Sequence, residues 1–303
     1  MKRILVTGAT GFIGRHVLKA LGGRGFEIHM VSRSSRNPSA ELSAHRIDLL
    51  SIPSLLALIQ TVRPTHLLHL AWHRKTRCGF YDAPENYVWA RASMELFRGF
   101  VRMGGRRAVF AGSCAEYDWA YEILHETDTP SNARTDYGRA KNAARDGIQR
   151  MATDAGVSTA WARIFFTFGP HEPLGRLVSD VASSLAAGEV VATTNGQQKR
   201  DYLYVADVAA ALVALTESDV VGTINVASGE SVPIRHIVEL LGKFSGRSDL
   251  LAIGARASES EEPKRLVADV TKLRTELGIL PRYRLEEGLE TTFKWWQRRT
   301  SVP

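Results

Sequence analysis

The sequence is poor in cysteine and has no long uninterrupted apolar run. Cys78 and Cys114 are the two cysteines among its 303 residues, too few for a disulfide framework and without metal-ligand spacing. No segment approaches the roughly 20 consecutive apolar residues of a membrane span. Gly8 and Thr10 interrupt the first apolar segment, which argues against a secretory signal. We therefore expect a cytoplasmic protein with no membrane partner and no metal site.

The chain also lacks a concentrated block of basic residues, although its formal net charge is +7. Lysine and arginine are spread along the sequence, which predicts a solvated basic surface and no nucleic-acid partner. Hydrophobic residues make up 44% and charged residues 23% of the chain, values that are ordinary for a globular protein. The length fits one main domain with a smaller one.

What the sequence does contain, at its start, is a glycine-rich loop between an apolar run and an amphipathic segment. Ile4–Val6 predicts a strand, and Gly8–Gly14, with the spacing Gly-x-x-Gly-x-x-Gly, leads into a helix. Glycines let the backbone bend tightly and let a pyrophosphate approach the helix N-terminus, whereas the alternative is a plain tight turn. The strand before the loop and the helix after it favour a dinucleotide site. Its expected contacts are Gly8, Thr10, Gly11, Phe12, Ile13 and Gly14.

Strand and helix patterns alternate through the first half of the chain. Apolar runs at 26–31, 65–70, 107–112 and 158–164 predict strands, and 53–62, 85–103 and 136–155 predict helices. This alternation predicts an α/β fold with a doubly wound parallel Rossmann sheet over residues 1–168. After residue 168 the pattern changes to helices near 175–187, 206–217, 234–244 and 285–299. We expect a smaller, mostly helical substrate lobe over 169–303, with segments near 200–227 returning to the first domain.

Three residues are arranged as a proton-transfer site. Tyr137 and Lys141 have the i, i+4 spacing that puts two side chains on one helix face. A neighbouring ammonium favours the phenolate and brings the tyrosine pKa toward the working range. Ser113 follows the fourth predicted strand, at the carboxyl edge where open α/β sheets bind ligands. Each feature alone is common on a protein surface or in a turn, but together they predict a catalytic group.

These motifs resemble the extended short-chain dehydrogenase/reductase family, in its nucleotide-sugar epimerase, dehydratase and reductase branch. The resemblance covers nearly the whole chain. The matching segments are Gly8–Gly14, Asp48–Leu49, His69–Ala71, Ser113–Tyr117, Tyr137–Lys141, Arg200–Asp207 and Asn225–Gly229.

The resemblance implies an enzyme with a bound NAD(P) and a nucleotide-diphosphate sugar as substrate. It implies that Ser113, Tyr137 and Lys141 act on a hydroxyl or ketone, and that Lys141 also holds the nicotinamide ribose. The remaining implied contacts are Asp48 and Leu49 at the adenine, Ala71 in the cofactor groove, Arg200 at the substrate diphosphate and Arg265 as a further phosphate contact. Either arginine could instead be a surface charge. Members of the family often dimerise through helices that include the one carrying the tyrosine, so we expect a homodimer.

The end of the second predicted strand lacks the acidic residue that NAD-specific sites place at the ribose 2′-hydroxyl. The residues there are Ser32 and Arg33, with Arg36 nearby. They are suited to a 2′-phosphate, so we predict a preference for NADP(H), with NAD as the alternative cofactor.

The loop after Ser113 lacks the two carboxylates that the family's dehydratases carry, because Cys114 and Ala115 follow directly. Dehydratase activity is therefore not expected. Cys114 is a candidate substrate contact, with His171 as a partner, or else a small packing residue. Nearby aromatic residues either shape the sugar pocket or belong to the core; they are Trp72, Tyr81, Tyr87 and Trp89.

Together these features predict an NADPH-dependent reductase of the C4 ketone of a nucleotide-linked 4-keto-6-deoxyhexose, in deoxysugar or polysaccharide biosynthesis. Two alternatives stay open. One is a nucleotide-sugar 4-epimerase with retained NAD, and the other is a non-catalytic NADP(H)-binding sensor or scaffold. The motifs name neither the base of the nucleotide nor the stereochemistry at C4.

Overall fold

The largest element of the fold is a seven-stranded parallel sheet. The computed structural model describes residues 2–33, 42–73, 79–257 and 262–300. The sheet has the strand order β12-β7-β5-β4-β1-β2-β3. Its strands are β1 (Lys2–Thr7), β2 (Phe26–Ser32), β3 (Ser43–Arg46), β4 (His66–His69), β5 (Arg107–Ser113), β7 (Ser158–Ile164) and β12 (Gly222–Val226). The order runs outward from β1 in both directions, which confirms the predicted doubly wound α/β fold.

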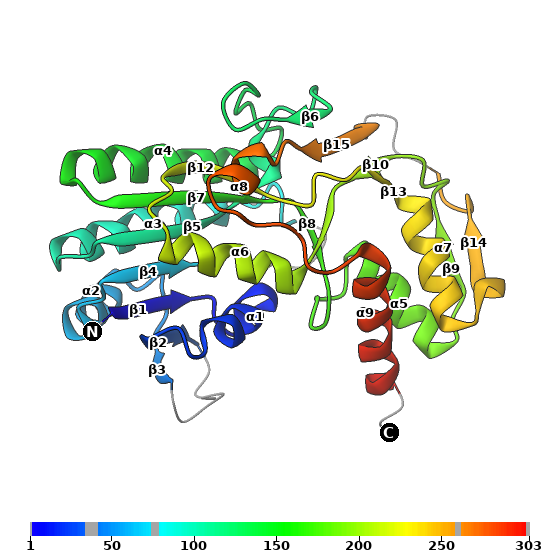
Figure 1. The fold of residues 1–303 in the computed structure, drawn as a ribbon, viewed down its shortest axis with the longest axis horizontal. Coiled ribbons are helices and arrows are strands. Elements are labelled where there is room, and N and C mark those ends of the chain that lie inside the picture. The colour runs from blue at the N-terminus through cyan, green and yellow to red at the C-terminus, as the bar shows by residue number, and fades with distance from the viewer. Residues whose placement is uncertain (1, 34–41, 74–78, 258–261, 301–303) are drawn as a thin grey trace.

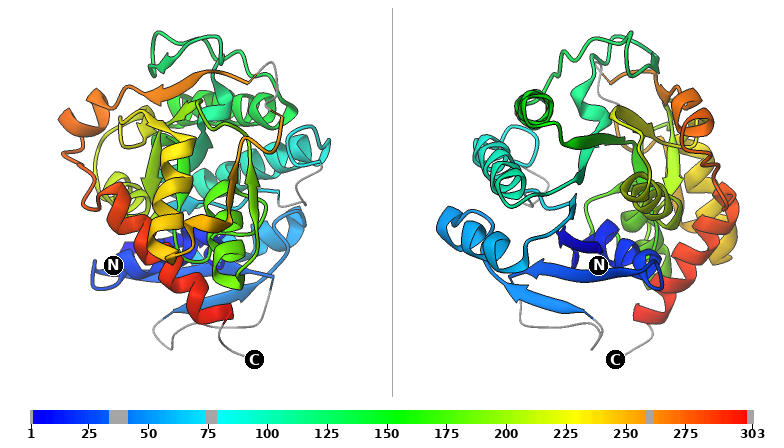
Figure 2. Two further views of the ribbon diagram at one scale, coloured as in Figure 1. Left: turned by 90° about the vertical axis from the view of Figure 1, so that its right-hand side faces the viewer. Right: turned by 60° about the vertical axis from the view of Figure 1, so that its left-hand side comes forward.

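Helices cover both faces of this sheet (Figure 2). One face carries α1 (Phe12–Leu21) and α6 (Val205–Glu217), and the other carries α2 (Ile52–Val62), α3 (Glu85–Arg102) and α4 (Asp136–Ala155). Strand β1 shows why two layers form: Ile4 and Val6 pack into one core, whereas Leu5 packs into the other. Side chains alternate along a strand, so a continuously apolar strand needs cover on both sides.

A second group of helices packs at the end of the main sheet (Figure 1). Its core is formed by α5 (Leu177–Ala187), α7 (Ile234–Ser245) and α9 (Leu285–Thr300). Phe12 and Ile13 at the start of α1 also pack against this core, so the glycine-loop helix contacts both parts of the molecule.

Short strands connect the two parts. A four-stranded sheet has the order β13-β10-β15-β6, and β11 pairs with β8 and β14 with β9. The remaining elements are β6 (Ile123–Leu124), β8 (Phe166–Phe168), β9 (Val191–Thr193), β10 (Lys199–Arg200), β11 (Tyr202–Tyr204), β13 (Val232–Pro233), β14 (Leu251–Ile253), β15 (Arg265–Ala268), α8 (Thr271–Thr275) and the 3₁₀ turns η1 (Cys114–Glu116) and η2 (Ser248–Leu250). The division of the chain at residue 168 stays a prediction. Within the described residues, no helix has both the length and the apolar composition that crossing a membrane needs.

Candidate active site

The glycine-rich loop has the tight geometry that its sequence predicts. Gly8 adopts a φ of +70°, and a Cβ there would lie 2.7 Å from the Ala71 nitrogen. At Gly14 a Cβ would lie 2.1 Å from the Gly8 carbonyl oxygen. Helix α1 begins after Gly11 with no side-chain cap and no acidic residue in its first turn. The first N–H groups of the helix therefore suit an anionic diphosphate, and the residues present fit a dinucleotide.

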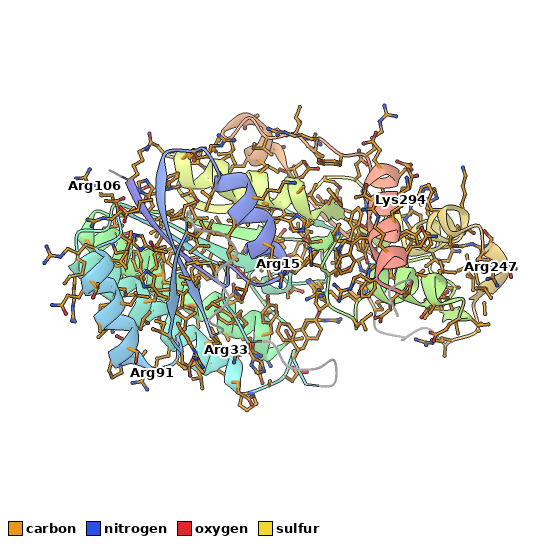
Figure 3. The ribbon with its side chains drawn as sticks, turned by 90° about the horizontal axis from the view of Figure 1, so that it is seen from below. Arg15, Arg33, Arg91, Arg106, Arg247 and Lys294 are labelled. Carbon is orange, nitrogen blue, oxygen red and sulfur yellow. The ribbon has the colours of Figure 1, made fainter. Side chains whose placement is uncertain are left out.

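The end of β2 carries basic side chains. Ser32 is buried and Arg33 is exposed directly after it (Figure 3), while Arg36 lies outside the described residues. Arg46 on β3 pairs with Ser32 in the parallel register and is also exposed. The sequence gives little sign of Arg46, because β3 is a short edge strand with no apolar pattern. Arg33 thus follows Ser32 directly at the end of β2, and Arg46 lies opposite Ser32 on the neighbouring strand β3.

Asp48 and Leu49, predicted at the adenine, follow β3. Leu49 is buried, whereas Asp48 is exposed and its carboxylate accepts a hydrogen bond of 3.1 Å from the Leu50 nitrogen. That bond stabilises the turn before α2. The contact of Asp48 with the adenine stays a prediction.

Ser113, Tyr137 and Lys141 come together where β5 ends against the first turns of α4. The Ser113 hydroxyl makes a side-chain hydrogen bond with Tyr137. Thr135 caps α4 by accepting a bond from the Gly138 nitrogen, and the Tyr137 nitrogen donates to the Tyr81 carbonyl at 2.7 Å. These contacts fix the turn on which the tyrosine stands.

The Tyr137 ring lies among aromatic side chains. Its centroid is 4.6 Å from that of Phe80, 6.0 Å from Tyr81 and 6.2 Å from Trp72. Burial raises the pKa of Tyr137, and the hydrogen bond with Ser113 lowers that pKa by less than burial raises it. The expectation that Lys141 brings the Tyr137 pKa down toward neutrality is therefore wrong: the phenol is protonated near neutral pH, the form that donates a proton.

Lys141, one turn further along α4 than Tyr137, is almost fully buried. Its Nζ donates a 2.7 Å hydrogen bond to the Ala111 carbonyl and lies 3.6 Å from the centroid of the Trp72 ring. Burial lowers the pKa of Lys141 to about 7, although the nearby Glu116 acts in the opposite direction. Trp72 is held in turn by Asn86, whose side chain accepts from the indole N–H at 2.9 Å.

Glu116 is a structural partner of the site that sequence reasoning missed. It is fully buried, and its Oε1 accepts a 2.8 Å bond from the Ser113 nitrogen. Its carboxylate also accepts from Trp161 at 2.9 Å and from the buried Arg163 at 2.9 Å. The one available signal is a carboxylate within an otherwise small and apolar segment after a buried strand. A Cβ on Gly112 would lie 2.3 Å from the Trp161 nitrogen, so glycine is needed there.

A cleft of about 810 Å³ opens beside Tyr81, the residue that contacts Tyr137. Arg200 lies in its wall, where its guanidinium bonds the Glu262 carboxylate at 2.7 Å and the Pro263 carbonyl at 2.8 Å. Arg265 pairs with Lys199 on the neighbouring strand and its Nε is buried without a hydrogen-bond partner. Arg200 is thus a buried residue that lines the cleft, whereas Arg265 is not among the residues that line it.

Cys114 and His171 occupy different surroundings. Cys114 is buried in the main core, and burial raises the pKa of its thiol to about 12. His171 instead contacts Trp295 of α9, with ring centroids 4.8 Å apart, and faces His16 of α1. This geometry favours a packing role for Cys114, and the substrate contact stays a prediction. Within the described residues, no three or more His, Cys, Asp or Glu side chains form a group that could hold a metal ion.

The aromatic residues near the third strand divide between pocket and core. Tyr81 lines the cleft and Trp72 covers Lys141, whereas Trp89 packs on the core between the sheet and its helices. Tyr87 is exposed, and its hydroxyl donates to Asp136 at 3.0 Å.

Known structures share the whole fold. A structure of UDP-glucose 4-epimerase from Thermotoga maritima covers 98% of this chain and 99% of its own, with a TM-score of 0.87 and 23% identity. The structure of MoeE5 in complex with UDP-glucose and NAD covers 99% of this chain and 100% of its own, with a TM-score of 0.86 and 28% identity.

Sequence comparison agrees with the fold. UDP-glucuronic acid decarboxylase 1 from Xenopus tropicalis is 26% identical over 310 residues, which cover 98% of this chain and 72% of the relative. The enzyme of the same name from Arabidopsis thaliana is 26% identical, with 95% of this chain and 68% of the relative covered. The model of the NAD dependent epimerase/dehydratase family matches residues 4–227. The predicted resemblance is confirmed, and the chain belongs to the NAD dependent epimerase/dehydratase family.

Proposed function

We propose that the chain catalyses the NADPH-dependent reduction of the C4 ketone of a nucleotide-linked 4-keto-6-deoxyhexose. The observation that carries this proposal is the protonated Tyr137 beside Ser113, in ring contact with Tyr81, which lines a cleft large enough for a sugar nucleotide. Reduction of a ketone requires a proton donor at the oxygen, and a phenol with a raised pKa is the donor form.

Each residue of the group has a separate task in this reaction. NADPH, when bound, supplies the hydride to C4. Tyr137 transfers its phenolic proton to the carbonyl oxygen, and Ser113 donates a hydrogen bond to the same oxygen. Lys141 favours the phenolate that remains and holds the nicotinamide ribose. Its pKa near 7 allows the ammonium to pass a proton toward Tyr137 without a large energy cost.

The basic end of β2 supports NADP(H) as the cofactor. Arg33 follows Ser32 and Arg46 lies opposite it, and neither strand places a carboxylate at those positions. A charge-assisted contact with a phosphate contributes about 1.5–3 kcal/mol. We expect Arg33→Ala to weaken NADPH binding about tenfold or more and to leave NADH binding nearly unchanged. Equal losses for both cofactors, measured by fluorescence titration, would contradict this role.

The residues after Ser113 argue against an elimination, because they offer no carboxylate that can reach the substrate. Position 115 is alanine, and the Glu116 carboxylate is already bonded to Ser113, Trp161 and Arg163. A general acid or base must reach the proton that it transfers, and Glu116 is enclosed in the core.

The direct test is a panel of nucleotide-linked 4-keto-6-deoxysugars with NADPH, following cofactor oxidation and identifying the product sugar. We expect oxidation of NADPH with at least one nucleotide, and a loss of about 10²–10⁴-fold in turnover for Tyr137→Phe. UDP-glucuronic acid and UDP-glucose belong in the panel because the relatives' names and complexes include them. NADPH left untouched by every ketosugar would overturn the proposal.

A nucleotide-sugar 4-epimerase with retained NAD is the second candidate. It is favoured by the 4-epimerases that share the fold and by the NAD in the MoeE5 complex. Such an enzyme returns the hydride to its substrate, so it would purify with bound NAD and interconvert two sugars without net oxidation of the cofactor.

A further inference from the structure

The loop between β8 and α5 forms part of the cleft wall. It starts at Gly169 with a φ of +150°, and His171 adopts a φ of +70°, a conformation that non-glycine residues rarely take. The buried Ser179 hydroxyl bonds the Pro173 carbonyl at 2.8 Å, and Asp180 accepts from the Gly175 nitrogen at 2.6 Å. The first turn of α5 thus fixes the loop, which sets Glu172 in the wall.

Glu172 is a buried carboxyl group whose hydrogen bonding is incomplete. Only 3% of the residue is exposed, and its Oε2 has no hydrogen-bond partner. Buried polar atoms are nearly always paired, and each exception requires an explanation. The Ser179 backbone N–H, in the first turn of α5, hydrogen-bonds the Glu172 carboxyl group, so a purely structural role of Glu172 explains that contact. A structural role does not explain why Oε2 has no partner.

The surroundings of Glu172 favour its neutral form. The charged and titratable groups of the described residues that act on it are Arg176, Asp180 and Tyr202. Burial raises the pKa of Glu172 to about 8, and the opposing effect of Arg176 is smaller. A protonated carboxyl is both a donor and an acceptor, whereas the ionised form only accepts.

Arg176 connects Glu172 to the catalytic group. It directly precedes α5 and lines the same cleft, and its charge acts on Tyr81 and Tyr137 as well as on Glu172. Tyr81, Arg176 and Glu172 all line this cleft, so a substrate whose reacting carbon lies at Tyr137 can extend into it past these residues. The sugar is the part of that substrate nearest to Tyr137, because the reacting ketone belongs to it.

We propose that Glu172 is a specificity-determining residue that donates its carboxyl proton in a hydrogen bond to an oxygen of the substrate's sugar, with Arg176 holding an adjacent oxygen. This inference rests on the proposed function. The sugar oxygen supplies the partner that Oε2 lacks within the protein. The ligand is an oxygen-bearing neutral sugar, and a sugar with hydrogen in place of that oxygen binds less tightly because the buried donor is left unpaired.

The test compares Glu172→Gln, which keeps a neutral donor, with Glu172→Ala, which removes it. The matched control is Glu189→Gln, the same change at an exposed carboxylate of the cleft rim. Two ligands are titrated by calorimetry: the nucleotide sugar that gives the fastest NADPH oxidation, and its nucleoside diphosphate alone. We expect Glu172→Ala to bind the nucleotide sugar about tenfold more weakly, as for one lost hydrogen bond, and the nucleoside diphosphate unchanged.

The pH dependence separates this role from a structural one. Wild-type affinity for the nucleotide sugar should fall as the pH rises through about 8, and Glu172→Gln should show no such fall. The inference is wrong if Glu172→Ala weakens the binding of both ligands equally. It is also wrong if the affinity of Glu172→Gln falls with pH as that of the wild type does.

An infrared measurement keeps this inference distinct from the proposed function. The carboxyl C=O band that disappears in Glu172→Gln reports the protonation of Glu172 without any substrate. If the C=O band of a protonated Glu172 is present near pH 7 but no sugar of the panel oxidises NADPH, the proposed reaction is wrong and Glu172 is still a hydrogen-bond donor. An ionised Glu172 at that pH refutes the inference even if the reductase is active.

Discussion

Replacing Glu116 by glutamine removes one charge from the buried cluster beside the proposed catalytic residues and keeps the shape of the side chain. Arg163 is 1% exposed and Glu116 is fully buried, and their contact is 2.9 Å. Glu116→Gln leaves the Arg163 guanidinium without its ionised partner in the core. It also weakens the two bonds that Trp161 and Ser113 donate to the carboxylate.

The expected cost follows from this burial. Removing one partner of a buried ion pair lowers the free energy of unfolding by about 3–5 kcal/mol, because the remaining charge is buried without a partner or solvent to compensate it. Glutamine still accepts a hydrogen bond at Oε1, so we expect about 3 kcal/mol, the lower end. The matched control is Glu239→Gln, whose exposed i, i+4 partner Arg235 lies at 2.7 Å. That pair contributes about 0.3–0.5 kcal/mol.

Urea unfolding of both variants measures the difference in the free energy of unfolding. A second readout is local: Glu116 raises the pKa of Lys141, so Glu116→Gln should lower the pKa of Lys141 below its value of about 7. Selective lysine labelling across pH reports that shift. If Glu116→Gln destabilises the protein by no more than Glu239→Gln does, the cluster is not a buried charge network and the reasoning fails.

Other predictions follow from the same geometry. Gly14→Ala puts a Cβ 2.1 Å from the Gly8 carbonyl oxygen, so it should lower the free energy of unfolding by about 1–3 kcal/mol and abolish measurable NADPH binding. The control is Gly79→Ala, where a Cβ has no atom within 4 Å. It should change neither the stability measured by unfolding nor the NADPH binding measured by titration. The pKa of Glu172 rises from 4.5 to about 8 on folding, so the folded state binds more protons than the unfolded state between these values. Wild type should therefore lose stability from about pH 5 to about pH 8, and Glu172→Gln should lose less over this interval; identical urea midpoints for the two proteins at both ends would contradict the assignment.

The fold was predictable because its pattern is local. The helix 136–155 and the strand 158–164 were predicted with the bounds that α4 and β7 have in the structure. Strand β3 was missed because it lies at the sheet edge and carries no apolar run. The place of Ser113 at the end of β5 was predictable for a similar reason, since open α/β sheets bind ligands at the carboxyl ends of their strands.

The residues that complete the site were less accessible to sequence reasoning. Arg200 was predicted at the substrate diphosphate, but the sequence carries no sign that Glu262 bonds it, 62 residues further along. Arg265 was predicted as a further phosphate contact, yet the register of β15 with β10 sets it beside Lys199, and it is not among the residues that line the cleft.

The glycine-rich loop, the parallel sheet and the tyrosine–lysine pair were predictable from the sequence, because each depends on spacings of a few residues along one chain segment. The remaining features depend on tertiary contacts. Glu116 meets Arg163 across 47 residues, and Arg46 joins Ser32 only through strand pairing. The incomplete hydrogen bonding of Glu172 likewise depends on what packs around it. Burial and pairing are properties of the folded chain, and in the cleft wall burial favours the neutral form of Glu172.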